Sequence, residues 1–367
     1  MRILIAPDDF KGTLSATEAA AAIAEGWSQT RPGTEFHVRP VSDGGPGFVA
    51  ALATARGVDV RHIEVENSFG RPVTAMWCVA GETAYLEVAQ AVGLQFGADV
   101  LHAQSRGIGE LVRAAVEEGC RVIVLGLGGT NVNDAGAGML AALGATATDA
   151  TGDPVPLDFG PLPLIHAASV DLAPPLRLLA DCTVRIATDV DVPLLGPRGA
   201  TYGFASQKGG LDPDLVRLES ALASFAAACG RRADGKDAAV ALGAGAAGGL
   251  GFALLRLGAD RVPGIDFVLD SSDLNLDGVD LIVTGEGSLD WQSMRGKAIS
   301  GVAQRGLRRG IPVVAIAGRV EITARERSEM GLDAAYSVTE FEGDERALGQ
   351  PADALAATAA RVARTWG

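Results

Sequence analysis

The sequence alternates short, uninterrupted apolar runs with long alanine-rich stretches of helical character. The apolar runs cover residues 3–6, 122–125, 184–187, 281–283 and 313–317. Strands of this kind are typical of parallel sheets whose two faces are covered by crossover helices. The alternation therefore predicts an α/β protein. A chain of 367 residues, at roughly 100 to 200 residues per domain, is expected to form two domains.

Most of the apolar runs end in Gly, Asp or Thr. Ligands of open α/β sheets bind beyond the carboxyl ends of the strands, so functional residues are expected there. The net charge of −14 disfavours nucleic acid as a partner, because it repels a polyanionic backbone. No apolar run reaches the ~18 residues that a membrane span requires. The four cysteines are widely spaced, as in proteins whose thiols stay reduced, so a cytoplasmic location is expected.

The first strand end carries a lysine just ahead of a helix. Ser15 and Glu18 have the spacing of a capping box, which predicts that a helix begins at about residue 16. Lys11 then lies beside the positive end of the helix dipole, where a carboxylate or a phosphate would bind. A solvated loop lysine is the alternative. The next cluster, "SDGGPG", places Asp43 in what is otherwise an ordinary turn sequence.

The stretch "VIVLGLGGTNVNDAG" runs from a strand into a glycine cluster at residues 126–136. It lacks the third glycine of a dinucleotide fingerprint and the Gly-Lys-Ser/Thr of a Walker loop. The backbone amides around Gly128 and Gly129, with Thr130, Asn133 and Asp134, are expected to form a nest for an oxyanion. The alternative is a helix cap whose glycines allow close packing. A true G-x-G-x-x-G pattern begins at Gly243, and close helix packing explains it at least as well as phosphate binding does.

Two further strand ends carry carboxylates followed by lysines. Asp189 and Asp191 would lie on one side of an extended segment, and such a pair suits Mg²⁺ or the acceptance of a hydroxyl proton. Gln207 and Lys208 follow in a glycine-rich loop. Glu286, Asp290 and Lys297 repeat the scheme after another strand, although either cluster taken alone is also compatible with a solvated loop.

In this order, the five clusters resemble the motifs of the type I glycerate kinase family. The matching stretches are "APDDFKGTLSA", "SDGGPG", "GLGGTNVNDAG", "DVDVPLLGPRGA" running on to "FASQKGG", and "TGEGSLDWQSMRGK". The likeness extends from Arg2 to about Gly318. It implies a flavodoxin-like α/β domain made of residues 1–72 and 278–367, a second α/β domain made of residues 73–277, and an active site in the cleft between them.

The resemblance also implies an activity. Members of this family transfer the γ-phosphoryl group of ATP to a hydroxyl of D-glycerate, typically giving 2-phosphoglycerate and ADP, with Mg²⁺. Phosphoryl transfer needs a metal between phosphates, cations on the transferring group and an acceptor for the hydroxyl proton. A small-molecule hydroxy acid is therefore the expected partner, and a monomer and a homodimer both remain open.

On this basis each candidate residue is given a role as a hypothesis. Asp189 is the base or a Mg²⁺ ligand, and Lys11 and Lys297 complete the catalytic set. The metal ligands are Asp189, Asp191, Glu286 and Asp290. The acceptor is expected to contact Lys11, Asp43, Arg71, Arg106, Gln207 and Lys208. ATP is expected to contact Gly128, Gly129, Thr130, Asn133, Asp134, Lys208 and Lys297.

Several residues depart from the family pattern. Asp9 replaces a serine, Asn131 and Val132 replace alanine and threonine, Arg106 replaces a tyrosine, and Ser288 removes an arginine. Ionic positions are mostly kept while neutral neighbours vary, which suggests retained phosphoryl-transfer machinery with an altered acceptor pocket. A kinase for a different small hydroxy acid is thus the second hypothesis, and a non-catalytic ATP- or metabolite-binding protein is the third.

Overall fold

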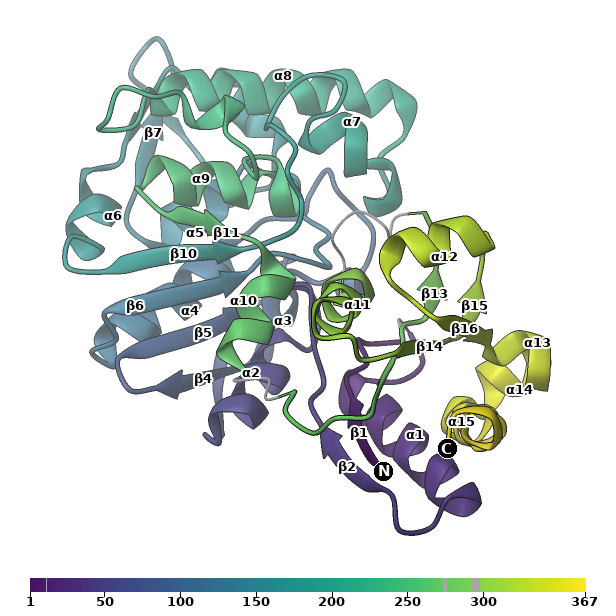
Figure 1. Cartoon of the computed structure of the whole chain (residues 1–367). Helices are drawn as coiled ribbons and strands as arrows, with labels where there is room; N and C mark the ends of the chain where they lie inside the picture. The colour runs from purple at the N-terminus through teal and green to yellow at the C-terminus, as the bar shows by residue number, and fades with distance from the viewer. Residues whose placement is uncertain (11, 273–275, 292, 294–297) are drawn as a thin grey trace. The chain divides into compact units, whose positions relative to one another are not determined.

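The computed structural model of the chain describes residues 1–10, 12–272, 276–291, 293 and 298–367 (Figure 1). Lys11 and Lys297 lie outside the described residues, so the structure says nothing of their predicted roles. The chain divides into two compact units. Unit 1 contains Met1–Asp43, Ala50–Gly57 and Ile265–Gly367, and unit 2 contains Gly44–Val49 and Val58–Gly264. Among the described helices, none is long and apolar enough to cross a bilayer.

Unit 1 is built on a five-stranded sheet in which every neighbouring pair is parallel. The spatial order is β16-β14-β12-β1-β2. Numbered in chain order within the unit, this is the 2-1-3-4-5 order of flavodoxin-like folds. Its elements are β1 (Arg2–Ile5), α1 (Ala16–Thr30), β2 (Glu35–Val38), α10 (Gly264–Ser271), β12 (Leu281–Thr284), β13 (Ser288–Leu289), α11 (Ala298–Arg309), β14 (Val313–Ala317), β15 (Arg319–Val320), α12 (Ala324–Met330), β16 (Ala334–Ser337), α13 (Val338–Glu342), α14 (Asp344–Gly349) and α15 (Pro351–Trp366).

Helices α1 and α15 cover one face of this sheet and lie side by side (Figure 1). Ile3, Ile5 and Val283 point into their shared core. The predicted capping box starts α1, since the amide of Glu18 donates to the hydroxyl of Ser15 at 3.3 Å. The two helices approach so closely at Gly26 that an added Cβ would lie 1.9 Å from the carbonyl oxygen of Ala356.

Unit 2 contains a six-stranded mixed sheet, a small antiparallel sheet and surrounding helices. The order of the main sheet is β11-β10-β6-β5-β4-β3, in which β11, β10, β6 and β5 are parallel and β5, β4 and β3 are antiparallel. Its elements are β3 (Val60–Glu66), β4 (Pro72–Ala80), β5 (Thr83–Glu87), α3 (Ala89–Val92), α4 (Arg106–Glu117), β6 (Val122–Gly126), α5 (Ala137–Ala142), β7 (Thr146–Thr148), β8 (Pro154–Val155), β9 (Ser169–Asp171), α6 (Ala173–Leu178), β10 (Thr183–Ala187), α7 (Ala200–Phe204), α8 (Asp212–Cys229), α9 (Leu250–Arg256) and β11 (Asp260–Val262). Helix α2 (Phe48–Arg56) has its first two residues in unit 2 and the rest in unit 1.

These elements confirm the predicted α/β class. Each of the five apolar runs forms a strand, namely β1, β6, β10, β12 and β14. The glycine pattern at Gly243 does not follow a strand, because the short 3₁₀ turn Ala238–Val240 precedes it. A Cβ on Gly248 would lie 1.9 Å from the carbonyl oxygen of Val132. Close packing therefore explains this pattern.

Candidate active site

Two loops leave the sheet of unit 1 next to each other, after β1 and after β12. The strand order reverses between these two strands, and sheets of this order bind ligands at that point. The amide of Ala6 donates to the carbonyl of Val283, and the amide of Asp8 donates to the carbonyl of Gly285, both at 2.8 Å. The hydroxyl of Thr284 donates back to the carbonyl of Ala6, also at 2.8 Å. These bonds hold the two loops together.

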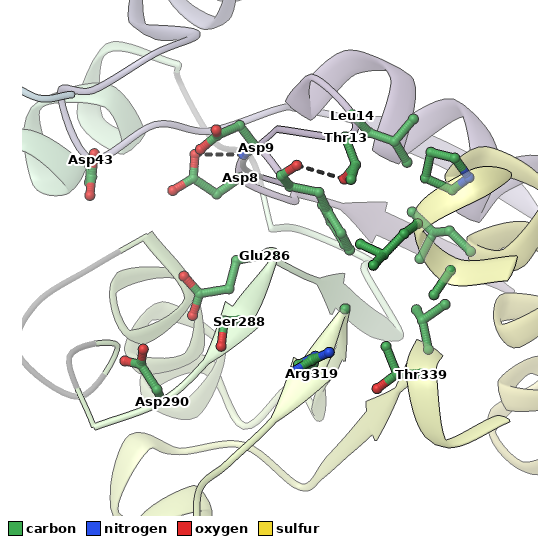
Figure 2. Close-up of a pocket in the computed structure, with 18 residues that line it drawn as sticks. Asp8, Asp9, Thr13, Leu14, Asp43, Glu286, Ser288, Asp290, Arg319 and Thr339 are labelled. Carbon is green, nitrogen blue, oxygen red and sulfur yellow. Dashed lines mark hydrogen bonds between the residues drawn. The ribbon is translucent and has the colours of Figure 1, made fainter. Parts of the chain in front are cut away.

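A cavity of about 290 Å³ opens at this point of unit 1 (Figure 2). One end is lined by carboxyl side chains, those of Asp8, Asp9, Asp43, Glu286 and Asp290. Figure 2 shows these acids at one side, with Leu14 and Thr339 at the other and Arg319 between them. The cavity also has an apolar end, which contains Leu14 and to which we assign the other large apolar lining residues, Phe10, Val338, Ala347, Leu348, Pro351 and Leu355.

The acidic side chains at the carboxylate end of the cavity repel one another. Burial raises the pKa of Asp8 well above its usual range, and the negative charges of Asp43, Asp9 and Glu286 raise it further. The amide of Asp9, which donates to the Asp8 carboxyl at 2.8 Å, opposes this shift. Like charges at close range disfavour ionisation of one another. A cation or a proton at this end of the cavity would therefore be stabilised.

Ser293 links two of these acids. It is fully buried, and its hydroxyl donates to the carboxylate of Glu286. The same hydroxyl accepts the amide of Asp290 at 3.2 Å, and the amide of Ser293 donates to the Asp290 carboxylate at 3.3 Å. One serine thus fixes the loop that carries both Glu286 and Asp290.

Arg319 is the single cation among the described residues that line the cavity. Its strand β15 pairs with β13, so that Arg319 lies opposite Ser288. The guanidinium of Arg319 donates to Asp344 at 2.9 Å on the exposed side. Gly318, just before it, would place a Cβ 2.4 Å from the carbonyl oxygen of Gly287, so only glycine permits this pairing of loops.

In unit 2, four parallel strands end at one edge of the sheet. Glu87, at the end of β5, is in register with Gly126 of β6, which is in register with Ala187 of β10. The predicted oxyanion loop follows β6 directly. A Cβ on Gly128 would lie 2.5 Å from the Cα of Gly45, so this glycine allows two loops to pack closely. This is the packing role that was the alternative explanation.

The amides of this loop nevertheless remain open to an anion. In the part of the chain that the structure describes, the amides of Gly128 and Gly129 donate to no acceptor. Gly128 is half-buried and Gly129 is exposed. The predicted nest therefore remains possible at these two amides, and its occupant stays a prediction.

The polar side chains of the same loop are buried and engaged within unit 2. Asp134 accepts the amide and the hydroxyl of Ser105 at 2.9 and 2.7 Å, and also the amide of Gly136 at 3.0 Å. Asn133 donates to the hydroxyl of Thr201 at 3.2 Å. Burial raises the pKa of Asp134, whereas these hydrogen bonds oppose the rise. Neither side chain contacts solvent, so in this structure both shape the loop.

Lys208 is buried as well, with only 3% of its surface exposed. Its ammonium donates to the carbonyl of Val132 at 2.7 Å and to the hydroxyl of Thr130 at 3.4 Å. Burial lowers the pKa of Lys208 to about 7, and the charge of Asp134 opposes this effect. The lysine that was predicted to bind phosphate thus fastens the loop from inside. Gln207 beside it is exposed.

The two carboxylates that follow β10 differ in their exposure and contacts. Strand β10 ends at Ala187 and the chain bends at Asp189, so the extended geometry expected for residues 189–191 is absent. Asp189 is half-buried and accepts the amide of Gly264 at 3.0 Å, whereas Asp191 is exposed. Both belong to unit 2, while Glu286 and Asp290 belong to unit 1.

The two arginines predicted to bind the acceptor also differ in their contacts. Arg71 is exposed, at the end of a turn in which the side chain of Asn67 accepts the amides of Phe69 and Arg71. The guanidinium of Arg106 forms ion pairs with three carboxylates: Asp158 at 2.9 Å, Glu110 at 3.4 Å and Glu66 at 3.7 Å. Because its charge is already offset, Arg106 is poorly suited to bind the carboxylate of an acceptor.

Comparison with known proteins decides the family. The model of the glycerate kinase family matches residues 3–367, which is nearly the whole chain. The chain belongs to the glycerate kinase family. It is 38% identical to glycerate 2-kinase of Escherichia coli, over 92% of this chain and 90% of that protein. It is equally similar to glycerate kinase of Bacillus subtilis, with the same identity and coverage.

A solved structure supports the same relationship. The crystal structure of a protein named glycerate kinase 2 from Salmonella typhimurium LT2 superposes with a TM-score of 0.80 at 38% identity, covering 100% of this chain and 98% of that one. The chain is thus a kinase that transfers a phosphoryl group to an alcohol, and its substrate is a small molecule. The fold class predicted from the sequence is confirmed.

Four residues in or beside the unit 1 cavity were given no role by the sequence analysis: Asp8, Asp9 and Arg319 line it, and Ser293 contacts two of its acids. Asp8 and Asp9 adjoin the first strand end, but only Lys11 was given a role there, and Asp9 was noted only as a departure from the family pattern. Ser293 is uncharged, so nothing in the sequence indicated that it contacts functional side chains. Arg319 follows β14 and becomes relevant only because β13 and β15 pair. All four residues follow the carboxyl ends of β1, β12 or β14, where the ligand-binding residues of an α/β sheet are expected.

The oxygen donors of this cavity suit a hard divalent ion. Among the described residues, no three His, Cys, Asp or Glu side chains converge closely enough to hold a metal on their own. Kinases commonly hold Mg²⁺ by only one or two carboxylates together with phosphate oxygens and water. The carboxylates of the unit 1 cavity fit that less demanding arrangement.

Proposed function

We propose that this member of the glycerate kinase family transfers the γ-phosphoryl group of ATP to the 2-hydroxyl of D-glycerate, giving 2-phosphoglycerate and ADP with Mg²⁺. The E. coli relative that supports this assignment is named glycerate 2-kinase and shares 38% of its residues with the chain. The structural observation that carries the proposal is the carboxylate end of the cavity at the strand-order reversal of unit 1.

Glu286 and Asp290 are the proposed metal-binding residues of unit 1. Both line the cavity, and Ser293 fixes both. A divalent cation bound there would offset charge on the phosphates, which is the main source of catalysis in phosphoryl transfer. The cation would also relieve the mutual repulsion of the acids around Asp8.

The remaining roles fall to residues of both units. Asp189 is proposed to accept the proton of the attacking hydroxyl. Its carboxylate is held in place by the amide of Gly264, which donates to it at 3.0 Å. Lys11 and Lys297 are proposed as the phosphate-neutralising cations. The amides of Gly128 and Gly129 are proposed to receive an anionic oxygen of a reactant. Arg71 is preferred over Arg106 for the acceptor carboxylate, because Arg106 is already paired.

The test is a measurement of ADP release over a panel of hydroxy acids, with the position of the new phosphate read by phosphorus NMR. D-Glycerate should be the best acceptor and the phosphate should appear on C2. EDTA should abolish turnover and excess Mg²⁺ should restore it. Turnover of a larger hydroxy acid with none of D-glycerate would overturn the assigned acceptor. Binding of ATP without ADP release from any acid would overturn the reaction itself.

A further inference from the structure

The apolar end of the unit 1 cavity has no use in the binding of D-glycerate. Every carbon of D-glycerate carries oxygen, so the molecule has little apolar surface to bury. Phe10, Leu14, Val338 and Leu355 nevertheless line the same cavity as the acids, and Figure 2 shows Leu14 on the side away from them. A ligand that fills the whole cavity must therefore combine an apolar part with a part that binds a cation.

We propose that this apolar end binds the base of the nucleotide donor, so that unit 1 carries the nucleotide site. The inference rests on the proposed function, because it takes ATP as the donor. A nucleotide with Mg²⁺ has both of the required parts: a flat aromatic base and a metal-bound polyphosphate. The cavity lies where the strand order reverses, which is where sheets of this order bind nucleotide-like ligands.

The loop after β1 builds one wall of the apolar end. The amide of Phe10 donates to the carbonyl of Leu14 at 2.8 Å, and the amide of Leu14 donates back to the carbonyl of Phe10 at 3.2 Å. The hydroxyl of Thr13 donates to the same Phe10 carbonyl at 2.7 Å. This tight loop holds the Phe10 ring in place with only 4% of its surface exposed.

Helices α13, α14 and α15 build the other wall. Val338 begins α13 and is almost fully buried. Leu348, on α14, lines the cavity although 63% of its surface is exposed. A large apolar side chain at the mouth of a cavity is a surface that a ligand would cover. Leu348 is therefore the residue at which the proposal can be tested with little risk to folding.

The experiment compares Leu348→Asp with Leu307→Asp. Leu307, on α11 of unit 1, is 58% exposed and does not line the cavity, so it is a matched control. The probes are ADP and inorganic pyrophosphate, each with saturating Mg²⁺, measured by isothermal titration calorimetry on the full chain. Pyrophosphate reproduces the metal-bound phosphates and lacks the base.

The wild-type chain should bind Mg·ADP about tenfold or more tightly than Mg·pyrophosphate. Leu348→Asp should remove most of that difference and raise the KM for ATP by a similar factor, while the KM for D-glycerate stays within about twofold. Leu14→Ala, on a different element, should weaken Mg·ADP binding in the same direction. Leu307→Asp should match the wild type, and both aspartate variants should keep its melting temperature.

Two results would overturn the inference. One is equal affinity of the wild type for Mg·ADP and Mg·pyrophosphate. The other is a change at Leu348 that raises the KM for D-glycerate and leaves that for ATP unchanged, which would make the cavity an acceptor site. Failure of the proposed function looks different: Mg·ADP would still bind in a Leu348-dependent way, but D-glycerate would not be phosphorylated.

Discussion

The ammonium nitrogen of Lys208 lies 2.7 Å from the carbonyl oxygen of Val132, and both side chains are buried in unit 2. Burial lowers the pKa of Lys208 to about 7, despite the opposing charge of Asp134. In the unfolded chain the lysine titrates near its ordinary value of about 10.4. Between these two values the unfolded state binds more protons than the folded state, so stability rises with pH in that window.

Replacing Lys208 by methionine removes this titration. The free energy of unfolding of the wild type, relative to Lys208→Met, should increase by roughly 1 kcal/mol per pH unit between about pH 7.5 and pH 9. Urea unfolding at several pH values measures the difference. Lys236→Met, at a lysine whose side chain is 80% exposed, is the control and should show no such trend. Parallel pH profiles of the wild type and Lys208→Met would contradict the assignment of the pKa to burial.

Ser293→Ala should weaken the proposed metal site at Glu286 and Asp290 without unfolding the chain. The substitution removes the hydroxyl that binds Glu286 and the amide of Asp290. Loss of such a supporting bond typically lowers metal affinity about tenfold or more. Mn²⁺ binding, measured by electron paramagnetic resonance, and the Mg²⁺ concentration for half-maximal activity should both shift by about that factor. Ser293→Thr should retain most of the affinity, and Ser272→Ala, at another buried serine, should leave it unchanged.

Glu286→Gln should separate stability from activity. Glutamine can still accept the hydrogen bond from Ser293, but it removes one of the negative charges that raise the pKa of Asp8. The melting temperature should therefore stay the same or rise, while kcat should fall by about 100-fold or more. Calorimetry measures the melting temperature, and steady-state kinetics on the same preparation measure kcat. A variant of full activity would remove Glu286 from the metal site.

Asp189→Asn tests chemistry apart from structure at the second acid cluster. The asparagine oxygen can still accept the amide of Gly264, so the melting temperature should change little. A neutral amide cannot accept the hydroxyl proton and is a weaker metal ligand than a carboxylate, so kcat should fall by about 100-fold or more. Asp191→Asn, at the exposed neighbour, is the comparison. Near-normal turnover of Asp189→Asn would exclude both roles proposed for this residue.

Gly26→Ala should destabilise unit 1. The new Cβ would lie 1.9 Å from the carbonyl oxygen of Ala356, so α1 and α15 would have to separate. Such overpacking typically costs about 1–3 kcal/mol in the free energy of unfolding. Gly349→Ala is the control, since no atom lies within 4 Å of the Cβ it would gain. The control should be neutral or slightly stabilising, and equal effects of the two substitutions would refute the argument.

The sequence was sufficient for features set by local pattern. Uninterrupted apolar runs predicted the strands, and the spacing of Ser15 and Glu18 predicted the start of α1, because both depend only on neighbouring residues. The ends of the strands also drew attention to Asp43, Glu286 and Asp290, which line one cavity and whose roles stay predictions. Sequence reasoning is strong where a single element determines the outcome.

Sequence reasoning was weaker where burial, or a partner far away in the sequence, determines the role of a side chain. Lys208 looks like a phosphate-binding lysine, and only the fold shows that its ammonium faces Val132 inside unit 2. Arg106 looks like a carboxylate anchor, but the fold brings Glu66 and Asp158 from other segments to join Glu110 of its own helix around it. Asn131 stood out as a departure, yet it is fully buried and donates to Ser68 and to the backbone of Gly97.

The close contact of α1 with α15 has a consequence for synthesis on the ribosome. Chains fold domain by domain as they emerge, N-terminal parts first. Unit 2 is complete once Gly264 has left the exit tunnel, whereas α1 must wait for α15, which is made only after all of unit 2 and most of the rest of unit 1. Until then the apolar face of α1 has no covering helix. The nascent chain therefore has to keep the apolar face of α1 from aggregating while unit 2 is made, and Asp8 comes under the influence of Glu286 only after unit 2 is complete.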